Sequence, residues 1–507
     1  MAGEGSVRAL GIVGTGAMGS GIAQIAAQAG IDVRLLDARP GAAAAAAQKL
    51  GDIWAGLAAK GRMTAEAVAA ARARLHPIAA DADLAGCDVV IEAIVEDLAA
   101  KKALFASLEP IVGERCILAT NTSSLSVTAI ASGCKAPGRV AGFHFFNPVP
   151  LMKVVEVVDG ALSAPEVGAT LAELATRMGH RPVRCIDSPG FIVNHAGRGL
   201  GTEALRIVAG EGAARFVDVD RALRDQAGFR MGPFELLDLT ALDVSQPVME
   251  SIYRQYHEEP RYRPSWLLRQ RLDAGLLGRK AGRGFYVYRD GKADVPPEQP
   301  VPAVAPCPVW IWADDAEWRD ALATIAAAAG WPVESGARPG GTALCLLAPL
   351  GDDATSAAER AGADPARSVA VDAAFGLAKR RVMMTNPATR ARFADAAHAL
   401  LATGGVPVTR IKDSPGFIAQ RTVATIVNIA CDIAQQCVAA PADIDAAVTL
   451  GLGYPKGPLA LGDAFGAPRI AAVLARLHAL TGDPRYRASP WLRRRAALGL
   501  SLLHAEA

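Results

Sequence analysis

The sequence predicts an α/β protein in which a doubly wound, mostly parallel sheet is followed by an all-α domain, a small α/β module and a second copy of the all-α domain. Residues before Asp187 alternate short β-rich runs with alanine-rich amphipathic stretches, as a doubly wound sheet requires. After Asp187 the pattern is helical, and its landmarks recur near the carboxyl terminus. We therefore expect five segments, namely 1–187, 188–289, a linker 290–307, the module 308–405 and the second helical domain 406–507.

A glycine-rich loop follows the first predicted strand. Residues 7–13 are typical of a buried strand and run into Gly14-Thr-Gly16-Ala-Met-Gly19, with a helical stretch at 20–29. Gly14 allows a tight turn, Gly16 lets the backbone approach a pyrophosphate, and Gly19 lets helix and strand pack closely. The phosphate then rests on the helix N-terminus. The pattern predicts a Rossmann-type domain whose cofactor contacts include Gly14, Gly16, Ala17, Met18 and Gly19.

The second predicted strand, residues 32–36, ends in the acidic residue Asp37. A carboxylate at this position accepts hydrogen bonds from the adenosine ribose, which favours NAD over NADP, although the nearby Arg39 leaves NADP open. Further strands are expected at 88–94 and 116–119. The six alanines at 42–47 indicate a helix without chemical meaning.

His144 and Glu156 are equidistant from Pro150, which lies in a proline-rich turn between two apolar runs. If those runs pair as antiparallel strands, the two side chains share a face with Cβ atoms about 5 Å apart. A carboxylate there would fix the imidazole tautomer and favour a general base. A purely structural pair in a hairpin is the alternative.

Composition narrows the class of protein. The formal net charge of +2 gives no sign of a nucleic-acid partner beyond local phosphate sites. No apolar run approaches the roughly 20 residues that cross a bilayer, and the amino terminus lacks a signal pattern, so we expect a cytoplasmic protein without a membrane partner. The eight cysteines show no Cys-x-x-Cys spacing, so we expect reduced thiols and no metal.

The helical domain is repeated. Ser188-Pro-Gly-Phe-Ile-Val-Asn194 recurs as Ser414-Pro-Gly-Phe-Ile-Ala-Gln420, and Arg261-Tyr-Arg263 recurs as Arg485-Tyr-Arg487. Residues 290–308 hold six prolines, which indicates a linker. The module 308–405 shows strand-like runs at 309–312, 342–348 and 368–371 but has no glycine fingerprint and no His–Glu hairpin. We therefore expect no second active site.

Taken together, these motifs resemble those of the 3-hydroxyacyl-CoA dehydrogenase family, in its long form with an added module and second helical domain. The matching blocks are Gly14 to Gly19 with Ile22-Ala23, Asn121-Thr-Ser-Ser124, His144-Phe-Phe-Asn-Pro-Val-Pro150, Ser188 to Asn194 and Gly232-Pro-Phe-Glu-Leu-Leu-Asp238. The resemblance is closest over residues 8–288. Long forms of this kind resemble those that oxidise 3-hydroxyadipyl-CoA in phenylacetate catabolism, or those that act on 3-hydroxybutyryl-CoA in β-oxidation-type fatty acid metabolism.

The resemblance implies an oxidoreductase that uses NAD to convert a (3S)-3-hydroxyacyl-CoA to the 3-oxoacyl-CoA. His144 would be the base and Glu156 would orient it, while Ser123 and Asn194 would hold the reacting oxygen or the thioester carbonyl. Ser123 could instead cap a turn, and Asn194 could be a helix-surface amide. His195 stands where the family has an arginine, and Gln420 replaces the asparagine in the second copy, which implies a structural role for that copy.

By the same resemblance, further positions would contact the cofactor or the CoA phosphates. The cofactor contacts would be Asp37, Glu96, Lys101, Ser123, Asn147 and Lys280, and the CoA contacts would be Lys60 and Arg62. Glu96 and Lys101 could equally be an exposed helical pair, and Lys60 and Arg62 could be solvated charges.

Three other functions remain as alternatives. A dehydrogenase of a sugar acid or other small hydroxy acid would use the same fold, and a non-catalytic NAD-binding protein would keep the fold without the chemistry. A serine hydrolase built on Ser123, His144 and Glu156 would lack the Gly-x-Ser-x-Gly elbow. Relatives with one helical domain pair through it, so we expect either a pseudo-dimeric monomer or a homodimer.

Overall fold

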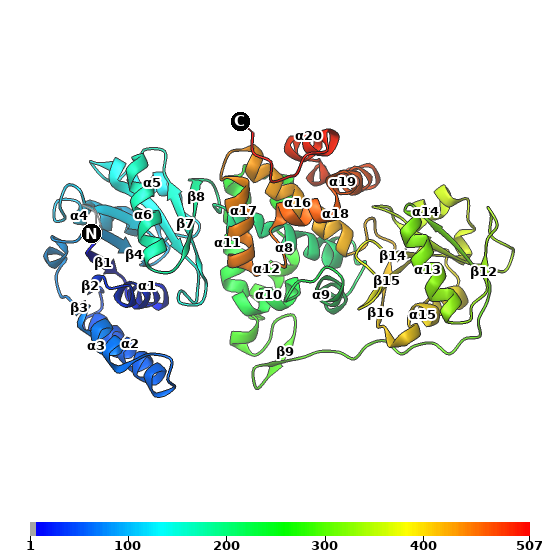
Figure 1. Ribbon diagram of the computed structural model, residues 1–507, viewed down its shortest axis with the longest axis horizontal. Helices are drawn as coiled ribbons and strands as arrows, with labels where there is room; N and C mark the ends of the chain where they lie inside the picture. Colours follow the sequence, from blue (N-terminus) through cyan, green and yellow to red (C-terminus); the bar gives the residue numbers. More distant parts are fainter. Residues whose placement is uncertain (1–6, 507) are drawn as a thin grey trace. The chain divides into compact units, whose positions relative to one another are not determined.

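The computed structural model describes residues 7–506 and divides into two compact units. The first unit holds the chain as far as His195 together with Gln436–Leu452, and the second holds Ala196–Gln435 together with Gly453–Glu506. The first unit is built on one large sheet covered by helices, and the second combines a bundle of helices with a smaller sheet (Figure 1), which confirms the predicted α/β class.

The first unit contains an eight-stranded sheet with the order β3-β2-β1-β4-β5-β6-β7-β8. All neighbouring strands are parallel except the antiparallel pair β6 and β7. This order is that of a dinucleotide-binding sheet extended by a hairpin. The strands are β1 (Ala9–Val13), β2 (Asp32–Leu36), β3 (Leu75–Pro77), β4 (Val89–Glu92), β5 (Ile117–Thr120), β6 (Val140–Phe145), β7 (Val154–Asp159) and β8 (Arg181–Ile186).

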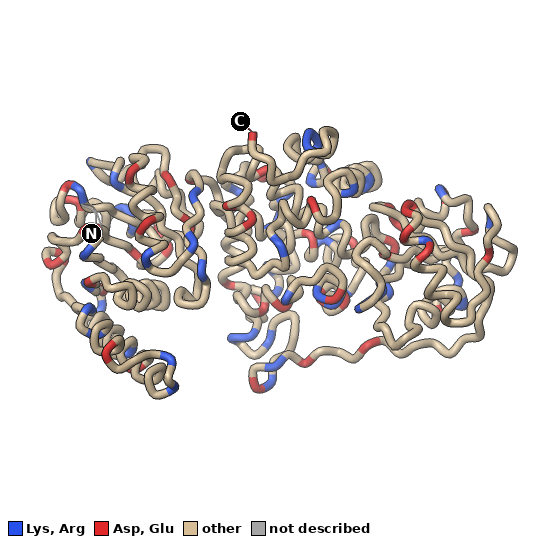
Figure 2. The backbone as a smooth tube through the Cα atoms, in the orientation of Figure 1, with Lys and Arg blue, Asp and Glu red and all other residues tan. Residues whose placement is uncertain are grey.

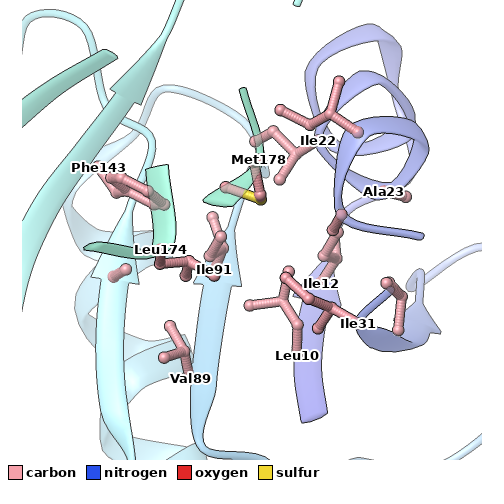
Figure 3. Close-up of a cluster of buried hydrophobic side chains, with 14 of the residues drawn as sticks. Leu10, Ile12, Ile22, Ala23, Ile31, Val89, Ile91, Phe143, Leu174 and Met178 are labelled. Carbon is pink, nitrogen blue, oxygen red and sulfur yellow. The ribbon is translucent and has the colours of Figure 1, made fainter. Parts of the chain in front are cut away.

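Helices cover this sheet and bury its apolar strands. Figure 3 shows Leu10 and Ile12 of β1 beside Ile91 of β4, with Ile22 of the first helix and Met178 packed over them. Parallel strands covered on both faces carry such continuous apolar runs. The helices of this unit are α1 (Ala17–Gln28), α2 (Ala42–Ala59), α3 (Ala65–Ala73), α4 (Leu98–Leu108), α5 (Val127–Ala131), α6 (Pro165–Arg177), α7 (Val193–Ala196) and α17 (Pro441–Leu452).

The helix α17 comes from the second helical domain yet belongs to the first unit. Arg181 at the start of β8 donates to the Asp443 carboxylate over 3.0 Å, and the N–H of Ile186 donates to the Val438 carbonyl over 3.0 Å. Helix α17 and the segment before it therefore contact the last strand of the N-terminal sheet, although they lie some 250 residues further along the chain.

The two helical repeats correspond element by element. Helix α8 (Arg198–Leu205) and α16 (Ala419–Gln435) begin them, and a break with positive φ, at Ala241 in one and Gly466 in the other, separates two later helices of each. The remaining pairs are α9 (Phe216–Asp225) with α17, α10 (Pro233–Thr240) with α18 (Pro458–Phe465), α11 (Leu242–Gln255) with α19 (Ala467–Thr481), and α12 (Trp266–Asp273) with α20 (Pro490–Leu498).

A buried ionic cluster joins the two repeats inside the second unit. The fully buried guanidinium of Arg421 on α16 donates to the Glu203 carboxylate of α8 over 2.6 Å, to Glu211 over 2.7 and 2.9 Å, and to the Tyr486 hydroxyl over 2.6 Å. Bidentate contacts of this kind fix geometry as well as charge. The repeats are therefore held together by a specific contact that is fully buried at Arg421 and Glu203.

The linker begins with a short hairpin, β9 (Val287–Arg289) and β10 (Lys292–Asp294), which the proline content did not predict. Further along, the Glu298 carboxylate accepts from Arg380 of the module over 2.6 Å and lies 3.3 Å from Arg221 of α9. The middle of the linker is therefore fastened both to the first helical repeat and to the module.

The module contains a six-stranded sheet with the order β12-β11-β13-β14-β15-β16, in which only β14 and β15 are antiparallel. Its elements are β11 (Val309–Ala313), α13 (Ala316–Ala328), β12 (Val333–Glu334), β13 (Leu344–Ala348), α14 (Ala354–Ala361), β14 (Ser368–Asp372), β15 (Arg381–Thr385), α15 (Ala391–Leu401) and β16 (Val408–Lys412). The succession from β13 to β16 reproduces that from β5 to β8, including the antiparallel pair.

Equivalent aspartates align the two sheets. Asp187 after β8 accepts from the N–H groups that start α5, and Asp413 after β16 accepts from those that start α14. When the two sheets are aligned on these aspartates, Val382 falls at the position of Glu156. The register pairs Val382 with Asp372 as it pairs Glu156 with His144, so Asp372 falls at the position of His144. The duplication therefore includes the hairpin, which the sequence did not reveal because both motif residues have changed.

Asp372 is fully buried at the position that His144 holds in the first sheet. The Gln420 amide donates to its Oδ1 over 3.0 Å, while its Oδ2 has no hydrogen-bond partner among the described residues. Burial raises the pKa of Asp372 to about 6, against the opposing hydrogen bonds from Gln420 and from the Ala374 N–H.

Charges of both signs are interspersed along the chain (Figure 2), so charge alone singles out no binding face. Within residues 7–506, no single helix has the length and apolar character to cross a membrane, although α18 and α19 would pass together as a pair bent by 93°.

Replacing Asp372 with asparagine tests this burial through the pH dependence of stability. The folded state holds the Asp372 proton more tightly than the unfolded chain, so stability is lost as pH rises from the ordinary value of 3.8 through about 6. The full loss corresponds to about 3 kcal/mol. We expect the difference in melting temperature between Asp372→Asn and the parent to shift in favour of the variant as pH rises from 3.8 to about 6, and to stay constant above that pH. The exposed Asp320→Asn is the control, and parallel curves for all three proteins would contradict the assignment.

Candidate active site

The hairpin of β6 and β7 places His144 directly opposite Glu156. The imidazole Nδ1 lies 2.5 Å from Glu156 Oε2, and both side chains are buried. This contact indicates the tautomer in which Nδ1 carries the hydrogen and donates it to the Glu156 carboxylate. Nε2 is then the ring nitrogen that can accept a proton. The rings of Phe146 and Phe191 lie 4.5 and 5.8 Å from the imidazole and hold its plane.

Glu156 is itself held from its other side. Its Oε1 accepts from the backbone N–H groups of Ile192 and Val193 over 2.9 and 2.8 Å, at the start of α7. The carboxylate therefore links the hairpin to the segment that carries Asn194, and both of its oxygens are satisfied although it is fully buried.

Asn194 and Ser123 meet beside this hairpin. The Asn194 amide donates to the Ser123 carbonyl over 3.2 Å, and the Asn121 carboxamide accepts from the Phe145 N–H over 2.9 Å. The structure thus brings together His144, Glu156, Ser123 and Asn194 within the first unit. An imidazole paired with a carboxylate can accept the proton of an alcohol, and a nearby hydroxyl and amide can hold its oxygen by hydrogen bonds.

The glycine loop is shaped as a phosphate site requires. Gly14 has a φ of +95°, and a Cβ on Gly19 would lie 1.8 Å from the Gly14 carbonyl oxygen. A Cβ on Gly16, in contrast, would meet no atom within 4 Å. Gly14 and Gly19 are thus required by the fold, whereas the space above Gly16 is available for a pyrophosphate at the start of α1.

Asp37 is anchored as the acid at the end of β2. Its carboxylate accepts from the Thr15 N–H over 2.9 Å, the Thr15 hydroxyl over 2.7 Å and the Arg39 Nε over 3.1 Å. Burial opposes its charge, but these hydrogen bonds outweigh burial and hold the pKa of Asp37 well below its ordinary value. The Arg39 guanidinium pairs with Asp37 although its side chain is 74% exposed.

A groove of about 700 Å³ connects the glycine loop to the turn after His144. Gly16 and Ala17 line one part of it and Asn147 another, so these predicted contacts share one cavity. The Met18 side chain packs instead against the core. The wall also includes Ser20 and Gln24 of α1, Leu151, and Lys49 and Ile53 of α2.

The sequence did not single out Lys49, although it lies at helical spacing from groove-lining Ala42, Ala45 and Ile53. Lys60 caps the end of α2 and Arg62 follows in the turn before α3, both exposed. Lys280 lies in the second unit, where its ammonium is 2.5 Å from the Asp243 carboxylate. The roles of these cations stay predictions.

Glu96 and Lys101 are not an exposed helical pair. Lys101 on α4 is 1% exposed, and Glu96 precedes that helix. The Lys101 ammonium lies 2.8 Å from both oxygens of Glu92 and 3.3 Å from Glu96 Oε2. Glu92, which ends β4, was missed from the sequence because nothing local shows which cation it meets.

Among residues 7–506, no cluster of three or more His, Cys, Asp or Glu side chains could hold a metal ion. The residues present fit a dinucleotide instead, because open space above Gly16 adjoins the anchored acid Asp37.

Two family descriptions match the chain. "3-hydroxyacyl-CoA dehydrogenase, NAD binding domain" matches residues 9–188, and "3-hydroxyacyl-CoA dehydrogenase, C-terminal domain" matches 190–288 and again 416–501. The second match of the C-terminal domain coincides with the second helical repeat.

Relatives of known name share the whole chain or its first half. The 3-hydroxyadipyl-CoA dehydrogenase of Escherichia coli (strain K12) is 39% identical over 497 residues, which cover 97% of this chain and 98% of the relative. A probable 3-hydroxybutyryl-CoA dehydrogenase of Bacillus subtilis (strain 168) is 40% identical over 279 residues, 55% of this chain and 96% of the relative. The crystal structure of 3-hydroxybutyryl-CoA dehydrogenase from Escherichia coli K12 superposes with a TM-score of 0.83 and 36% identity, covering 97% of this chain and 99% of that one.

Alanine substitutions at two glycines should separate cofactor binding from folding. We expect Gly16→Ala to keep the parent melting temperature, because its methyl meets no protein atom, and to weaken NAD binding at least about tenfold by filling the phosphate space. Gly19→Ala should lower the melting temperature, because its methyl would collide with the Gly14 carbonyl. Calorimetric titration with NAD and thermal melts measure the two effects. Unchanged NAD affinity in Gly16→Ala would contradict the placement of the phosphate.

Proposed function

The chain belongs to the 3-hydroxyacyl-CoA dehydrogenase family, and we propose that its substrate is (3S)-3-hydroxyadipyl-CoA, which it oxidises with NAD to the 3-oxoacyl-CoA. The observation that carries the substrate is the 39% identity to a 3-hydroxyadipyl-CoA dehydrogenase across 97% of the chain, module and second repeat included. The shorter 3-hydroxybutyryl-CoA relatives account for 55% of the chain.

A second candidate substrate is 3-hydroxybutyryl-CoA. It is favoured by the solved Escherichia coli structure of that name, which matches the same long architecture. The two substrates share their reacting carbons and differ in the acyl end, so one mechanism serves both.

In the proposed reaction, His144 Nε2 takes the proton of the C3 hydroxyl. Bound NAD supplies the acceptor for the hydride that leaves C3. Glu156 fixes the imidazole and stabilises the charge that it gains, as an acid partner does for other catalytic histidines. Ser123 and Asn194 hold the oxygen in place, which supplies orientation.

The remaining site residues would serve binding. We assign Asp37 to the adenosine ribose, the glycine loop to the pyrophosphate, and Asn147, Glu96 and Lys280 to the rest of the dinucleotide. Lys60 and Arg62 would meet the CoA phosphates as mobile cations at the rim. The enzyme would work in the cytoplasm, in phenylacetate catabolism or another β-oxidation-type sequence.

We also propose one active site per chain, with the two repeats paired as a pseudo-dimer. The N–H of Ile186 after β8 donates to Val438 of the second repeat, and the equivalent N–H of Lys412 donates to Ala213 of the first repeat over 2.9 Å. Each sheet is thus contacted by the helical repeat that follows the other sheet, as each subunit contacts its partner in an isologous dimer. The loop after β11 presents Asp314 and Asp315, which pair with arginines and repel a pyrophosphate.

A comparison of acyl chains tests the substrate. We expect kcat/KM for 3-hydroxyadipyl-CoA to exceed that for 3-hydroxybutyryl-CoA at least about tenfold, followed at the absorbance of reduced nicotinamide. His144→Gln should lower turnover of both substrates by roughly 10²–10⁴, because the base is lost in either case. A preference for the four-carbon substrate would favour the second candidate. No turnover of either CoA thioester would overturn the proposal.

Truncation and stoichiometry test the pseudo-dimer. A chain ending at residue 290 would leave buried Glu203 and partly buried Glu211 without Arg421, so we expect it to be insoluble. In the full chain, Arg421→Met should cost about 3–5 kcal/mol of unfolding free energy for the same reason. Titration of the full chain should give one tightly bound NAD per polypeptide. Two tight sites, or a soluble and fully active truncated chain, would contradict the arrangement.

A further inference from the structure

A relay of charges, buried at Glu92 and Lys101 and exposed at Glu96, runs from β4 to the loop that carries Ser123. Glu92 at the end of β4 is fully buried, and both of its oxygens lie 2.8 Å from the Lys101 ammonium. That ammonium also lies 3.3 Å from Glu96 Oε2. The Thr120 hydroxyl at the end of β5 donates to Glu92 as well, so the relay is tied to both strands.

The other oxygen of Glu96 organises the Ser123 loop. Glu96 Oε1 accepts from the Ser123 N–H over 2.8 Å, the Ser124 N–H over 3.0 Å and the Thr122 hydroxyl over 2.7 Å. It also lies 3.3 Å from the Ser123 hydroxyl and 3.0 Å from that of Ser124. A single carboxylate oxygen thus sets the path of the backbone from which the Ser123 hydroxyl projects.

Lys101 faces carboxylates rather than solvent. Its ammonium lies within 3.3 Å of three carboxylate oxygens, two from Glu92 and one from Glu96, and its side chain is 1% exposed. These ion pairs hold the ammonium between the end of β4 and Glu96.

The cation has a clear effect on Glu96. Burial works against the charge of this carboxylate, but Lys101 and the donors of the Ser123 loop together lower the pKa of Glu96 below its ordinary value. A charged acceptor forms shorter and stronger hydrogen bonds than a neutral one. The strength of the hydrogen bonds from the Ser123 loop to Glu96 therefore depends on the Lys101 cation.

We propose that Lys101 is a positioning residue that acts through Glu96 to fix the Ser123 hydroxyl against the reacting oxygen. The inference rests on the proposed function and deepens it, since it assigns a role to an ammonium that lies against Glu92 and Glu96. Its effect belongs to orientation, which appears in kcat.

The test is a double-mutant cycle with Ser123. Glu92→Gln/Lys101→Met removes the cation and neutralises its buried partner, so no unpaired charge is left at Glu92. We expect kcat for the 3-hydroxyacyl-CoA to fall about tenfold in the otherwise unchanged enzyme and less than about twofold when Ser123 is already alanine, with KM for NAD nearly constant. Lys102→Met, the neighbouring lysine on α4, is the matched control and should keep parental kinetics.

The other outcomes overturn the inference in distinguishable ways. An equal loss of kcat in the Ser123→Ala background would show that Lys101 acts elsewhere. A raised KM for NAD with kcat retained would show direct cofactor binding, and a lower melting temperature with unchanged kinetics would show a structural role alone. If the double variant does not fold, Glu96→Gln replaces it in the same cycle and is judged on kcat alone, because Glu96 is also assigned to the dinucleotide. Absence of turnover by the parent enzyme would overturn the proposed function itself.

Discussion

The Glu156 carboxylate is the interaction on which the catalytic geometry depends. One oxygen bonds the His144 imidazole across the β6–β7 hairpin, and the other accepts from the chain that leads into Asn194. The group is fully buried, so any shift of the hairpin or of α7 would leave part of it unsatisfied. The penalty for such a shift keeps the base and the amide in register without help from a bound ligand.

The hairpin and the glycine loop could be predicted because their geometry is local. Alternation along two strands fixes which side chains face one another, and equal distance from Pro150 gave the pairing of His144 with Glu156. The relay through Lys101 could not be predicted. It depends on β4 and β5 lying side by side, which brings Glu92 and Glu96 to the Ser123 loop although no short-range spacing connects them.

The repeated helical domain could be seen in the sequence, whereas the repeated sheet could not. Motifs such as Pro-Gly-Phe-Ile persist because they set turns that both copies need. In the module sheet Asp372 and Val382 stand at the places of His144 and Glu156, and what persists is backbone topology and a helix-capping aspartate. An antiparallel pair at a given place in a sheet leaves almost no trace in residue identity.

The exchanged contacts of the repeats have a consequence for how this chain can vary. In an assembly of two identical polypeptides, every substitution appears on both sides of the symmetry axis, so neither catalytic centre can be lost without the other. Joining the halves in one polypeptide removes that constraint. In this chain one hairpin carries His144 with Glu156 and the equivalent hairpin carries Asp372 with Val382, while the paired contacts between the repeats are the same on both sides.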